Sequence, residues 1–541
     1  MLKKFLCNFA VIITINHKLY MFRKGLLTAV MAVVCAMTAQ AIDEYQYHRG
    51  TAVLKGKVTN RNAGEWTTVQ VRTFNHFTDH ETVVNIPVKE DGSYEATLTL
   101  PHSQGISVDN TSFVFLAVGD TLEMMIDASK PDLEGVTFGG HGASTNINRL
   151  WPEVGKHYFG STQLYAGKPE KDQIPEWKKG LVKMMDTIID DIKADRLPVP
   201  AGTGSFEKEV LGATALSQPL MEVMRLNFDN MLRFDATEYY DFLADREEWL
   251  LDKPAMLFAI ESPGHLYSFT TLCMMVDVSW SASRLRMAYR ISDSQGLKDY
   301  NNQFVLPRNY DATLHRQMLA EREDTLMTIA DYFDMTTKAT LKRFGLKKMD
   351  FMLQMALCRY VYDEDRLGEK SPDIMAAYIA ALIPYIQNRT VANGVLENYR
   401  EFVIKNEGRL EEEASLSPEG DAIFERIIAP YRGNGLYVHF WGMSCGPCRV
   451  IMLDEREKVE EMKDKPVRFL YIADETDRPI EMAEQWMKEN DIKGEHIFVT
   501  HEEWKHLATK FQIAAIPFAT AVDKDGKLTK MQELDKLLFS E

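Results

Sequence analysis

Cysteine is scarce in this chain: six of its 541 residues are cysteine, and the sequence has no second pair with CxxC spacing. A structural zinc ion needs four ligands, so one pair alone does not indicate a zinc site. Clusters of basic residues are also missing, since 62 Lys and Arg stand against 79 Asp and Glu and the net charge is −17. This balance argues against a protein that binds nucleic acid.

The start of the chain has no apolar run long enough to cross a bilayer, because the run over 25–37 is too short. Two basic residues precede this run, and Ala39-Gln40-Ala41 follows it as a small-x-small cleavage site. This is the pattern of an export signal, so we expect residues 1–41 to be a signal peptide. The shape of the signal favours Met21 as the true start of translation. The mature chain would then begin near Ile42 and work in the periplasm or cell envelope.

The hydrophobic pattern divides the rest of the sequence into three domains. Residues 42–142 contain short alternating stretches such as 94–100 and a turn signal at Asp91-Gly92, which predict a hairpin and a small β-sandwich. Residues 143–428 have apolar residues at helical spacing and end in an acidic linker, which predicts a mostly helical segment. Residues 429–541 alternate strands and helices, which predicts an α/β domain.

Two cysteines lie in the predicted helical segment. Cys273 and Cys358 both stand on apolar stretches, where cysteine usually behaves as a small hydrophobic residue. A disulfide between them is possible in an oxidising compartment, and the sequence leaves both interpretations open.

The motif Cys445-Gly446-Pro447-Cys448 carries the strongest chemical signal. Two cysteines one helical turn apart can form and break a disulfide with little movement of the backbone. The run over 436–441 is apolar, β-branched and aromatic, so it predicts a buried strand, whereas 449–463 suits an amphipathic helix. The motif therefore lies where a strand turns into a helix. The N-terminus of that helix stabilises a thiolate on Cys445.

Phe440-Trp441-Gly442 precedes this motif, and Ile516-Pro517 follows it 69 residues after the second cysteine. With these residues the last fifth of the chain resembles the thioredoxin superfamily, specifically the exported TlpA/ResA-like thiol-disulfide oxidoreductases. The whole chain looks like the three-part proteins common in Bacteroidota, with a β domain, a helical segment and a C-terminal thioredoxin-like domain. The resemblance implies a thioredoxin-like fold for 429–541 and a cis Ile516–Pro517 bond across from the cysteines.

The resemblance also implies a role for each matching residue. Cys445 would attack a substrate disulfide, and Cys448 would resolve the mixed disulfide and release the reduced substrate. Pro447 suits the first helical turn, where its missing N–H costs nothing. Trp441 would support the motif, and Ile516 would present its backbone to an extended substrate strand. We expect no metal, and no cofactor besides the redox-active disulfide.

Three positions depart from the family pattern. Thioredoxins usually have an acid where this chain has His439, and that acid helps to deprotonate the buried cysteine. A histidine can accept a proton there, or it can be neutral and only pack, and both interpretations stay open. TlpA/ResA-like proteins often have an acid at the position of Ile451. Ser444 replaces the aromatic residue that often precedes the first cysteine, which predicts a looser or reshaped substrate groove.

These observations predict an exported enzyme that reduces disulfides of cell-envelope proteins, because CGPC also occurs in strongly reducing thioredoxins. The resemblance implies an inner-membrane electron donor of the DsbD or CcdA type. A thiol peroxidase of the AhpC/TSA family is one alternative, but the lone peroxidatic cysteine after a Pro-x-x-x-Thr-x-x pattern is missing. The other alternative is an envelope binding protein, in which the roughly 390 residues before the last domain engage a partner and the redox site is secondary or decayed.

The segment 501–506 has a histidine at each end and looks briefly like a zinc protease motif. That motif needs histidines four residues apart on one helix face, and here the spacing is one residue longer. We therefore expect His496, His501 and His506 to be solvated rather than to bind a metal.

Overall fold

The structure is a computed structural model of the chain. It describes residues 48–529 except 63, 79, 110–111, 131, 161–171, 230–239, 261–333, 335–336, 339–340, 343, 363–374, 376–378, 380–381, 407–415 and 514–515. The predicted signal peptide lies outside the described residues. So does Cys273, and with it the possible disulfide to Cys358.

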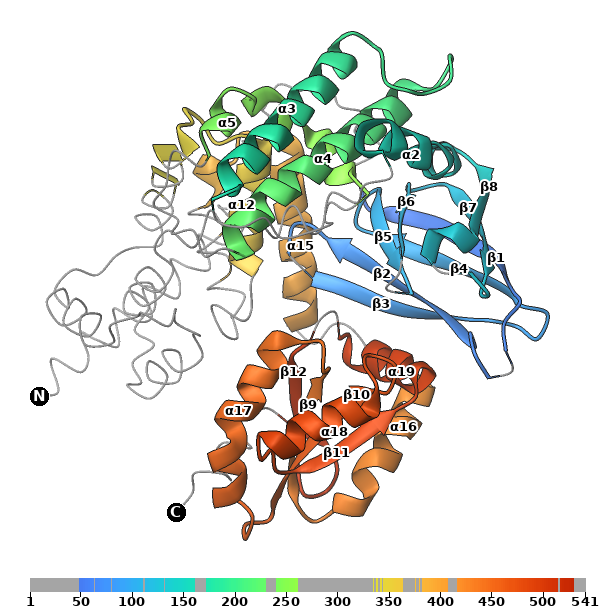
Figure 1. The fold of residues 1–541 in the computed structure, drawn as a ribbon, viewed down its shortest axis with the longest axis vertical. Helices are drawn as coiled ribbons and strands as arrows, with labels where there is room; N and C mark the ends of the chain where they lie inside the picture. The colour runs from blue at the N-terminus through green and yellow to red at the C-terminus, as the bar shows by residue number, and fades with distance from the viewer. Residues whose placement is uncertain are drawn as a thin grey trace, which may run out of the picture.

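The N-terminal part is rich in strands that form two sheets, drawn from blue to teal in Figure 1. One sheet has the order β4-β1-β7-β8 and the other β3-β2-β5-β6. Alternating apolar side chains of both sheets, such as Leu54 and Val71, fill one shared core. The strands are β1 (Gly50–Thr59), β2 (Thr68–Asn75), β3 (His80–Pro87), β4 (Ser93–Leu100), β5 (Gln104–Val108), β6 (Ser112–Leu116), β7 (Thr121–Asp127) and β8 (Val136–His141).

The predicted hairpin at Asp91-Gly92 is wrong, although a tight turn is present there. The N–H of Gly92, whose φ is +85°, donates to the carbonyl of Lys89. However, β3 before the turn pairs with β2, and β4 after it pairs with β1. The turn therefore leads the chain from one sheet to the other. A glycine turn forms equally well in both situations, so the local sequence cannot distinguish them.

The middle of the chain is helical over its described residues. Its helices pack around one apolar core, in which Met352, Met355 and Cys358 of α12 are fully buried. Burial raises the pKa of the Cys358 thiol, so this cysteine stays protonated and acts as a small apolar residue. The longer helices are α2 (Ala143–Phe159), α3 (Ile174–Lys193), α4 (Ser205–Asp229), α12 (Phe351–Tyr362) and α15 (Arg389–Asn406), and the short ones are α5 (Asp241–Ala244) and α6 (Glu247–Leu250).

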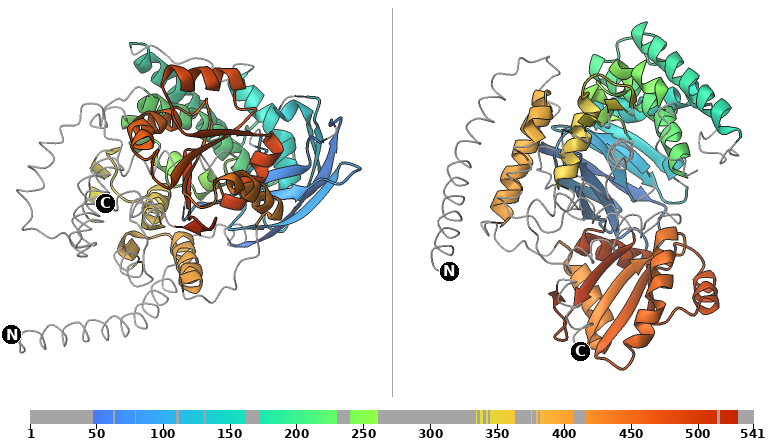
Figure 2. Two further views of the ribbon diagram at one scale, coloured as in Figure 1. Left: turned by 90° about the horizontal axis from the view of Figure 1, so that it is seen from below. Right: turned by 90° about the vertical axis from the view of Figure 1, so that its left-hand side faces the viewer.

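The C-terminal domain is an α/β unit around a five-stranded sheet of order β11-β10-β9-β12-β13. Strands β9, β10 and β11 are parallel, and β12 is antiparallel to β9. The right-hand view of Figure 2 shows this domain at one end of the molecule. Its elements are α16 (Pro418–Ile428), β9 (Gly435–Trp441), α17 (Gly446–Glu461), β10 (Val467–Asp474), α18 (Ile480–Glu489), β11 (Glu495–Val499), α19 (His501–Phe511), β12 (Phe518–Val522) and β13 (Leu528–Thr529).

Strand β9 supplies both faces of this sheet, because successive side chains of a strand point to opposite sides. Leu436, Val438 and Phe440 belong to the core under α16 and α19. Tyr437 and Trp441 belong to the core under α17 and α18. Because β9 is buried on both faces, apolar residues follow one another along 436–441 with little alternation.

Helix α16 belongs to the C-terminal domain, since Phe424, Ile427 and Ile428 are buried in its core. The predicted boundary at residue 429 left this helix in the preceding segment. The segment before residue 429 is acidic and contains Ser, Pro and Gly, which suggested a linker. In the structure, Ser417 caps α16 and Pro418 is its first residue.

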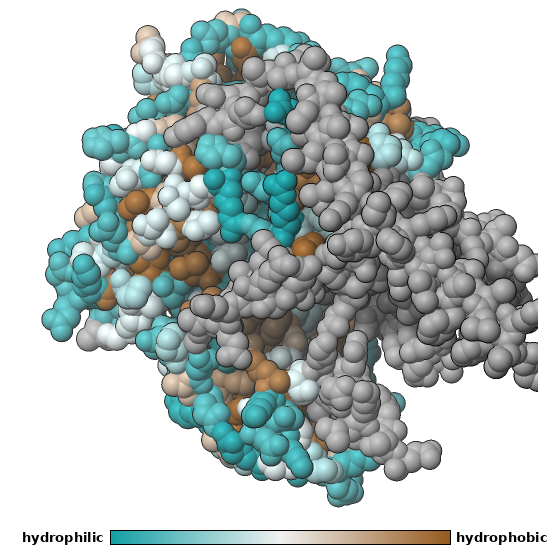
Figure 3. Space-filling view, turned by 180° about the vertical axis from the view of Figure 1, so that it is seen from behind, coloured by the Kyte–Doolittle hydropathy of each residue, from teal (hydrophilic) through white to brown (hydrophobic). Residues whose placement is uncertain are grey.

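Figure 3 shows one face of the molecule, on which hydrophilic and hydrophobic residues are mixed. On the face shown in Figure 3, hydrophilic residues prevail along the outline of the coloured part, as expected for a chain with a net charge of −17. No helix within the described ranges is both long and apolar enough to span a membrane.

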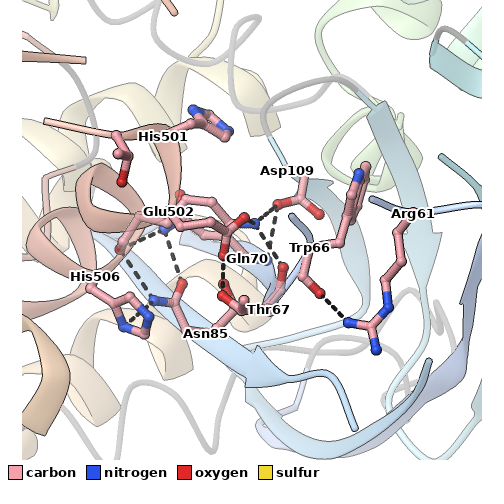
Figure 4. A network of polar contacts seen from close by, with 12 residues as sticks. Arg61, Trp66, Thr67, Gln70, Asn85, Asp109, His501, Glu502 and His506 are labelled. Carbon is pink, nitrogen blue, oxygen red and sulfur yellow. Dashed lines mark hydrogen bonds and ion pairs between the residues drawn. The ribbon is translucent and has the colours of Figure 1, made fainter. Parts of the chain in front are cut away.

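The C-terminal domain docks onto the sheet β3-β2-β5-β6 through helix α19 (Figure 4). Lys505 is 3% exposed, and its Nζ lies 2.9 Å from Asp109 Oδ1 and 2.7 Å from the carbonyl of Thr68. The carbonyl of Lys505 accepts hydrogen bonds from the side-chain amides of Gln70 and Asn85, at 3.0 and 3.2 Å. This interface is therefore specified by polar contacts around one buried cation.

The three histidines near α19 are half-buried and each contacts another side chain, so the expectation that they are solvated is met only in part. His501 Nδ1 lies 2.6 Å from Asp474 Oδ2, and His506 Nδ1 lies 3.3 Å from Ser417 Oγ. His496 stacks on Tyr471 with 5.2 Å between the ring centroids. These contacts join elements that are distant in sequence. The spacing of the histidines, which argued against a zinc site, therefore could not predict them.

Candidate active site

Cys445 and Cys448 lie at the junction of β9 and α17 and form a disulfide, with 5.3 Å between their Cα atoms. Cys445 is the N-cap of α17, and its Sγ accepts the N–H of Cys448 at 3.2 Å. Cys445 is half-buried, whereas Cys448 is fully buried. Of the two cysteines, Cys445 is therefore the one that is partly accessible from outside.

The Ile516–Pro517 peptide bond is cis, as the resemblance implies. The pairing of Phe518 in β12 with Phe440 in β9 brings this bond to the end of β9, next to the motif. The carbonyl oxygen of Ile516 lies 3.6 Å from Cys445 Sγ, and Pro517 is exposed. Residues that are about 70 positions apart in the sequence thus form one surface around the accessible sulfur.

Trp441 lies before the motif at the end of β9, and Pro447 lies within the motif. Trp441 is 1% exposed and shares its core with Cys448. Its ring lies 6.1 Å from that of Trp486 on α18, which fixes the end of β9. Pro447 is exposed in the first turn of α17.

Asp477 was not predicted from the sequence, and it holds the turn that precedes Cys445. Its Oδ2 accepts the N–H of Ser444 at 2.9 Å, and its Oδ1 accepts the Ser444 hydroxyl. The N–H of Cys445 also donates to the carbonyl of Gly442 at 3.0 Å. Ser444 is therefore held in place by Asp477, and a looser or reshaped substrate groove stays a prediction. The contact between Asp477 and Ser444 could have been predicted from strand order. The parallel strands β9 and β10 end at the same edge of the sheet, so the residues that follow them lie close together.

His439 lies inside the domain, 1% exposed, and neither of its ring nitrogens has a hydrogen-bond partner among the described residues. The Oε2 atom of Glu455 on α17 is 3.7 Å from its Nδ1. Glu455 also accepts hydrogen bonds from the hydroxyls of Tyr437 at 2.6 Å and Tyr471 at 3.1 Å.

Glu455 was also missed from the sequence, because the family pattern suggested an acid at the position of Ile451. Glu455 is seven residues after Cys448, and residues seven apart lie on the same face of a helix. This spacing was the signal that could have found it. In the part of the chain that the structure covers, no group of three or more His, Cys, Asp or Glu could hold a metal ion.

Residues 427–537 match the family model described as Redoxin. The thiol-disulfide oxidoreductase ResA of Bacillus thuringiensis subsp. konkukian is 28% identical over 102 residues, which are 19% of this chain and 56% of that protein. The ResA of Bacillus anthracis is 26% identical over 100 residues, which are 18% of this chain and 54% of that protein. The chain spans about half the length of the curated relatives it matches.

Two solved structures are similar to the same part of the chain. The thioredoxin domain of a thiol-disulfide oxidoreductase from Bacteroides vulgatus has 18% identity and a TM-score of 0.19, and the match covers 20% of this chain and 84% of that one. StoA from Bacillus subtilis has 15% identity and a TM-score of 0.17, with coverage of 20% and 85%. Because the family match and the ResA likeness coincide with the redox motif, the C-terminal domain is a TlpA/ResA-like member of the thioredoxin superfamily.

Proposed function

We propose that the chain is an exported thiol-disulfide oxidoreductase that reduces disulfides of cell-envelope proteins. The observation that carries this proposal is the asymmetry of the cysteine pair: Cys445 is accessible at the N-cap of α17, and its partner Cys448 is buried. The helix N-terminus favours a thiolate on Cys445, which is the reactive form of a cysteine. The other domains are then parts that orient this site or select its partners.

The proposed cycle starts from the dithiol. The Cys445 thiolate attacks one sulfur of a substrate disulfide, and the other substrate sulfur leaves with the electron pair and takes up a proton. The Cys448 thiolate then attacks Cys445, so the Cys445–Cys448 bond forms as the bond between Cys445 and the substrate breaks. The substrate has gained two electrons and the protein has lost two. The disulfide in the structure is the product of this step.

The proposal includes the partners and the organisation of the chain. The Ile516 carbonyl beside Cys445 supports a substrate that binds as an extended segment, because a backbone oxygen there can accept a backbone N–H. A membrane donor of the DsbD or CcdA type would restore the dithiol, so no bound cofactor is needed. We infer three working parts: a small β-sandwich over 42–142, helices from 143 up to α16, and a redox domain over 429–541 that also includes α16.

A trapping experiment tests this function. In the mature protein, Cys448→Ser stops the cycle at the mixed disulfide, so envelope proteins should become covalently trapped on Cys445. Cys445→Ser is the matched control and should trap nothing, because the attacking sulfur is absent. We also expect the wild-type protein to reduce the disulfides of insulin. Failure of both trapping and insulin reduction would contradict an enzymatic role and favour a binding protein.

A further inference from the structure

We propose that Asp477 selects substrates in which a lysine or arginine is next to the cysteine that Cys445 attacks. The inference rests on the proposed function and names its class of substrate, which is envelope proteins whose disulfide is flanked by a basic residue. Asp477 is a specificity-determining residue in this proposal, because it acts on the charge of the substrate and not on the reacting sulfurs.

The Asp477 carboxylate lies directly beside the turn that presents Cys445. It belongs to the loop between β10 and α18, at the sheet edge where the parallel β9 also ends. Its Oδ2 accepts the N–H of Ser444 at 2.9 Å, and its Oδ1 accepts the Ser444 hydroxyl. Ser444 is exposed and is joined to Cys445 by one peptide bond. The carboxylate is thus held one residue away from the attacking cysteine.

The same carboxylate also borders Ile516, whose backbone lies beside the attacking sulfur. A Cβ atom placed on Gly442 would lie 3.0 Å from Asp477 Oδ2 and 3.1 Å from Ile516 Cδ1. The absence of a side chain at Gly442 therefore lets the acid and Ile516 approach the same point. The Ile516 carbonyl oxygen is 3.6 Å from Cys445 Sγ. Asp477, Ile516 and Cys445 are all partly exposed, so they border one small area of the surface.

A substrate segment in this area brings its side chains close to the carboxylate. Successive residues of an extended segment are about 3.3 Å apart. A residue next to the substrate cysteine is therefore close to Ser444 when that cysteine reaches Cys445. Lysine and arginine have long stems with the charge at the end, so they span the remaining distance to Asp477.

The Asp477 carboxylate retains the capacity to bind a cation. An ionised carboxylate has about four acceptor sites on its two oxygens, and Ser444 occupies two of them. Within the described ranges, Asp477 forms no ion pair with another side chain. Glu475 and Arg478, which lie on either side of it in the loop, are both exposed and have opposite charges. A substrate ammonium or guanidinium would therefore form a charge-assisted hydrogen bond that no described side chain supplies.

The charge of Asp477 has an effect that its hydrogen bonds do not require. A nearby negative charge disfavours the Cys445 thiolate, although an uncharged asparagine can also accept the Ser444 N–H. A substrate cation that pairs with Asp477 offsets this charge, so the thiolate is favoured while a basic substrate is in place. An acidic substrate adds a second negative charge and is repelled. The reactivity of Cys445 therefore depends on the charge next to the substrate cysteine.

The chemistry of the step is that of the proposed cycle. The Cys445 thiolate attacks the substrate sulfur that is next to the basic residue, and the bond between these two sulfurs forms. The substrate disulfide breaks, and its other sulfur leaves with the electron pair and takes up a proton. Asp477 stays ionised throughout, and no further reagent is required.

Short blocked peptides that carry thionitrobenzoate on a single cysteine test this inference. Three peptides differ only in the two residues that flank the cysteine, which are both lysine, both glutamine or both glutamate. Attack of Cys445 on the peptide sulfur releases thionitrobenzoate, whose absorbance gives the second-order rate constant of the reduced mature protein. Cys445→Ser measures the release that is due to other cysteines.

At low salt we expect the wild-type protein to react about 10-fold faster with the lysine peptide than with the glutamate peptide. The glutamine peptide should lie between the two. Asp477→Asn should reduce the ratio to about 2-fold, and added salt should reduce the wild-type ratio, because screening weakens the attraction.

Two further variants separate the charge of Asp477 from other effects. Asp464→Asn removes the same charge at an exposed position after α17, so it should keep the wild-type ratio. Ser444→Ala removes one hydrogen bond from the carboxylate but keeps its charge, so it should keep most of the ratio even if the rates for all three peptides change.

The natural substrates give a second measurement. Envelope proteins that are trapped on Cys448→Ser are digested, and mass spectrometry identifies the cysteine bound to Cys445. Lysine or arginine should flank these cysteines more often than they flank other cysteines of the same extract. Equal frequencies would overturn the inference.

Two kinetic results would also overturn it. One is a lysine-to-glutamate ratio that is the same in Asp477→Asn as in Asp464→Asn. The other is a ratio that Ser444→Ala abolishes as completely as Asp477→Asn does, because this would assign the preference to the turn. If no peptide releases thionitrobenzoate above the Cys445→Ser level, the proposed function itself is contradicted, so the two failures are distinguishable.

Discussion

At the scale of single residues, Asp477 and Ser444 determine how Cys445 is presented. Both oxygens of the Asp477 carboxylate bind Ser444, the residue directly before the cysteine. The contact places a negative charge near the attacking sulfur and also immobilises the turn. The charge opposes the thiolate, whereas the immobilised turn keeps the sulfur at the helix N-terminus that favours it.

Asp477→Asn separates these two effects, since asparagine keeps the shape and one acceptor but removes the charge. We expect Cys445 to react about 3- to 10-fold faster with a neutral disulfide such as dithiodipyridine at low salt, because the thiolate loses a nearby like charge. The gain should shrink as salt is added. Asp464→Asn, an exposed acid after α17, is the control. A slower reaction in Asp477→Asn would mean that the turn, and not the charge, dominates.

At the scale of elements, the loop after β10 is tied to the start of α19. The hydrogen bond to Asp474 raises the pKa of His501, although burial opposes it. Asp474 also caps the N–H of Thr476 at 2.9 Å, and the same loop carries Asp477. The loop that holds Ser444 is therefore anchored by an ion pair when His501 is protonated.

This anchor predicts a pH dependence of stability. Because the folded-state pKa of His501 is raised, its contribution is complete below the unfolded value and disappears as pH rises through the folded value. We expect His501→Gln to lower the melting temperature more at about pH 5.5 than at about pH 8.5. The side chain is 43% exposed, so the contribution should stay below about 1 kcal/mol. An equal effect at both pH values would exclude the ion pair.

At the scale of the whole molecule, the redox domain is joined to the N-terminal sheet at a buried charge. Lys505 is surrounded by Asp109, Glu502 at 3.2 Å and the carbonyl of Thr68. At the other end of α19, the Gln512 amide bonds both the N–H and the carbonyl of Val83, at 2.9 and 3.0 Å. These two attachments hold both ends of α19 against the strands, and Figure 4 shows the network at the first of them.

Lys505→Met is expected to destabilise this junction by about 3 kcal/mol, because it leaves Asp109 buried without its cation. Burial raises the pKa of Asp109, and the Lys505 charge is what opposes that rise. The double variant Lys505→Met/Asp109→Leu should recover much of the loss. Calorimetry measures both, with the exposed Lys524→Met as the control. A single variant as stable as the wild type would show that the ion pair does not hold the domains together.

Local patterns were sufficient for much of the C-terminal domain. The strand over 436–441, the helix after it and the motif between them follow from hydrophobic period and from the spacing of two cysteines. The resemblance added the cis Ile516–Pro517 bond. The corresponding local signal at Asp91-Gly92 was interpreted incorrectly, because a turn does not specify which strand its neighbours will pair with.

The sequence by itself thus determined the redox motif, the elements on either side of it and the alternation that turns His439 inward, because these depend on residues close together in the chain. Only the tertiary structure decided that Glu455 lies beside His439, that Asp477 holds Ser444 and that Lys505 joins the domains. Each of these contacts depends on how a helix or loop packs against a strand. Such packing is selected by the complementarity of whole surfaces, which no local pattern encodes.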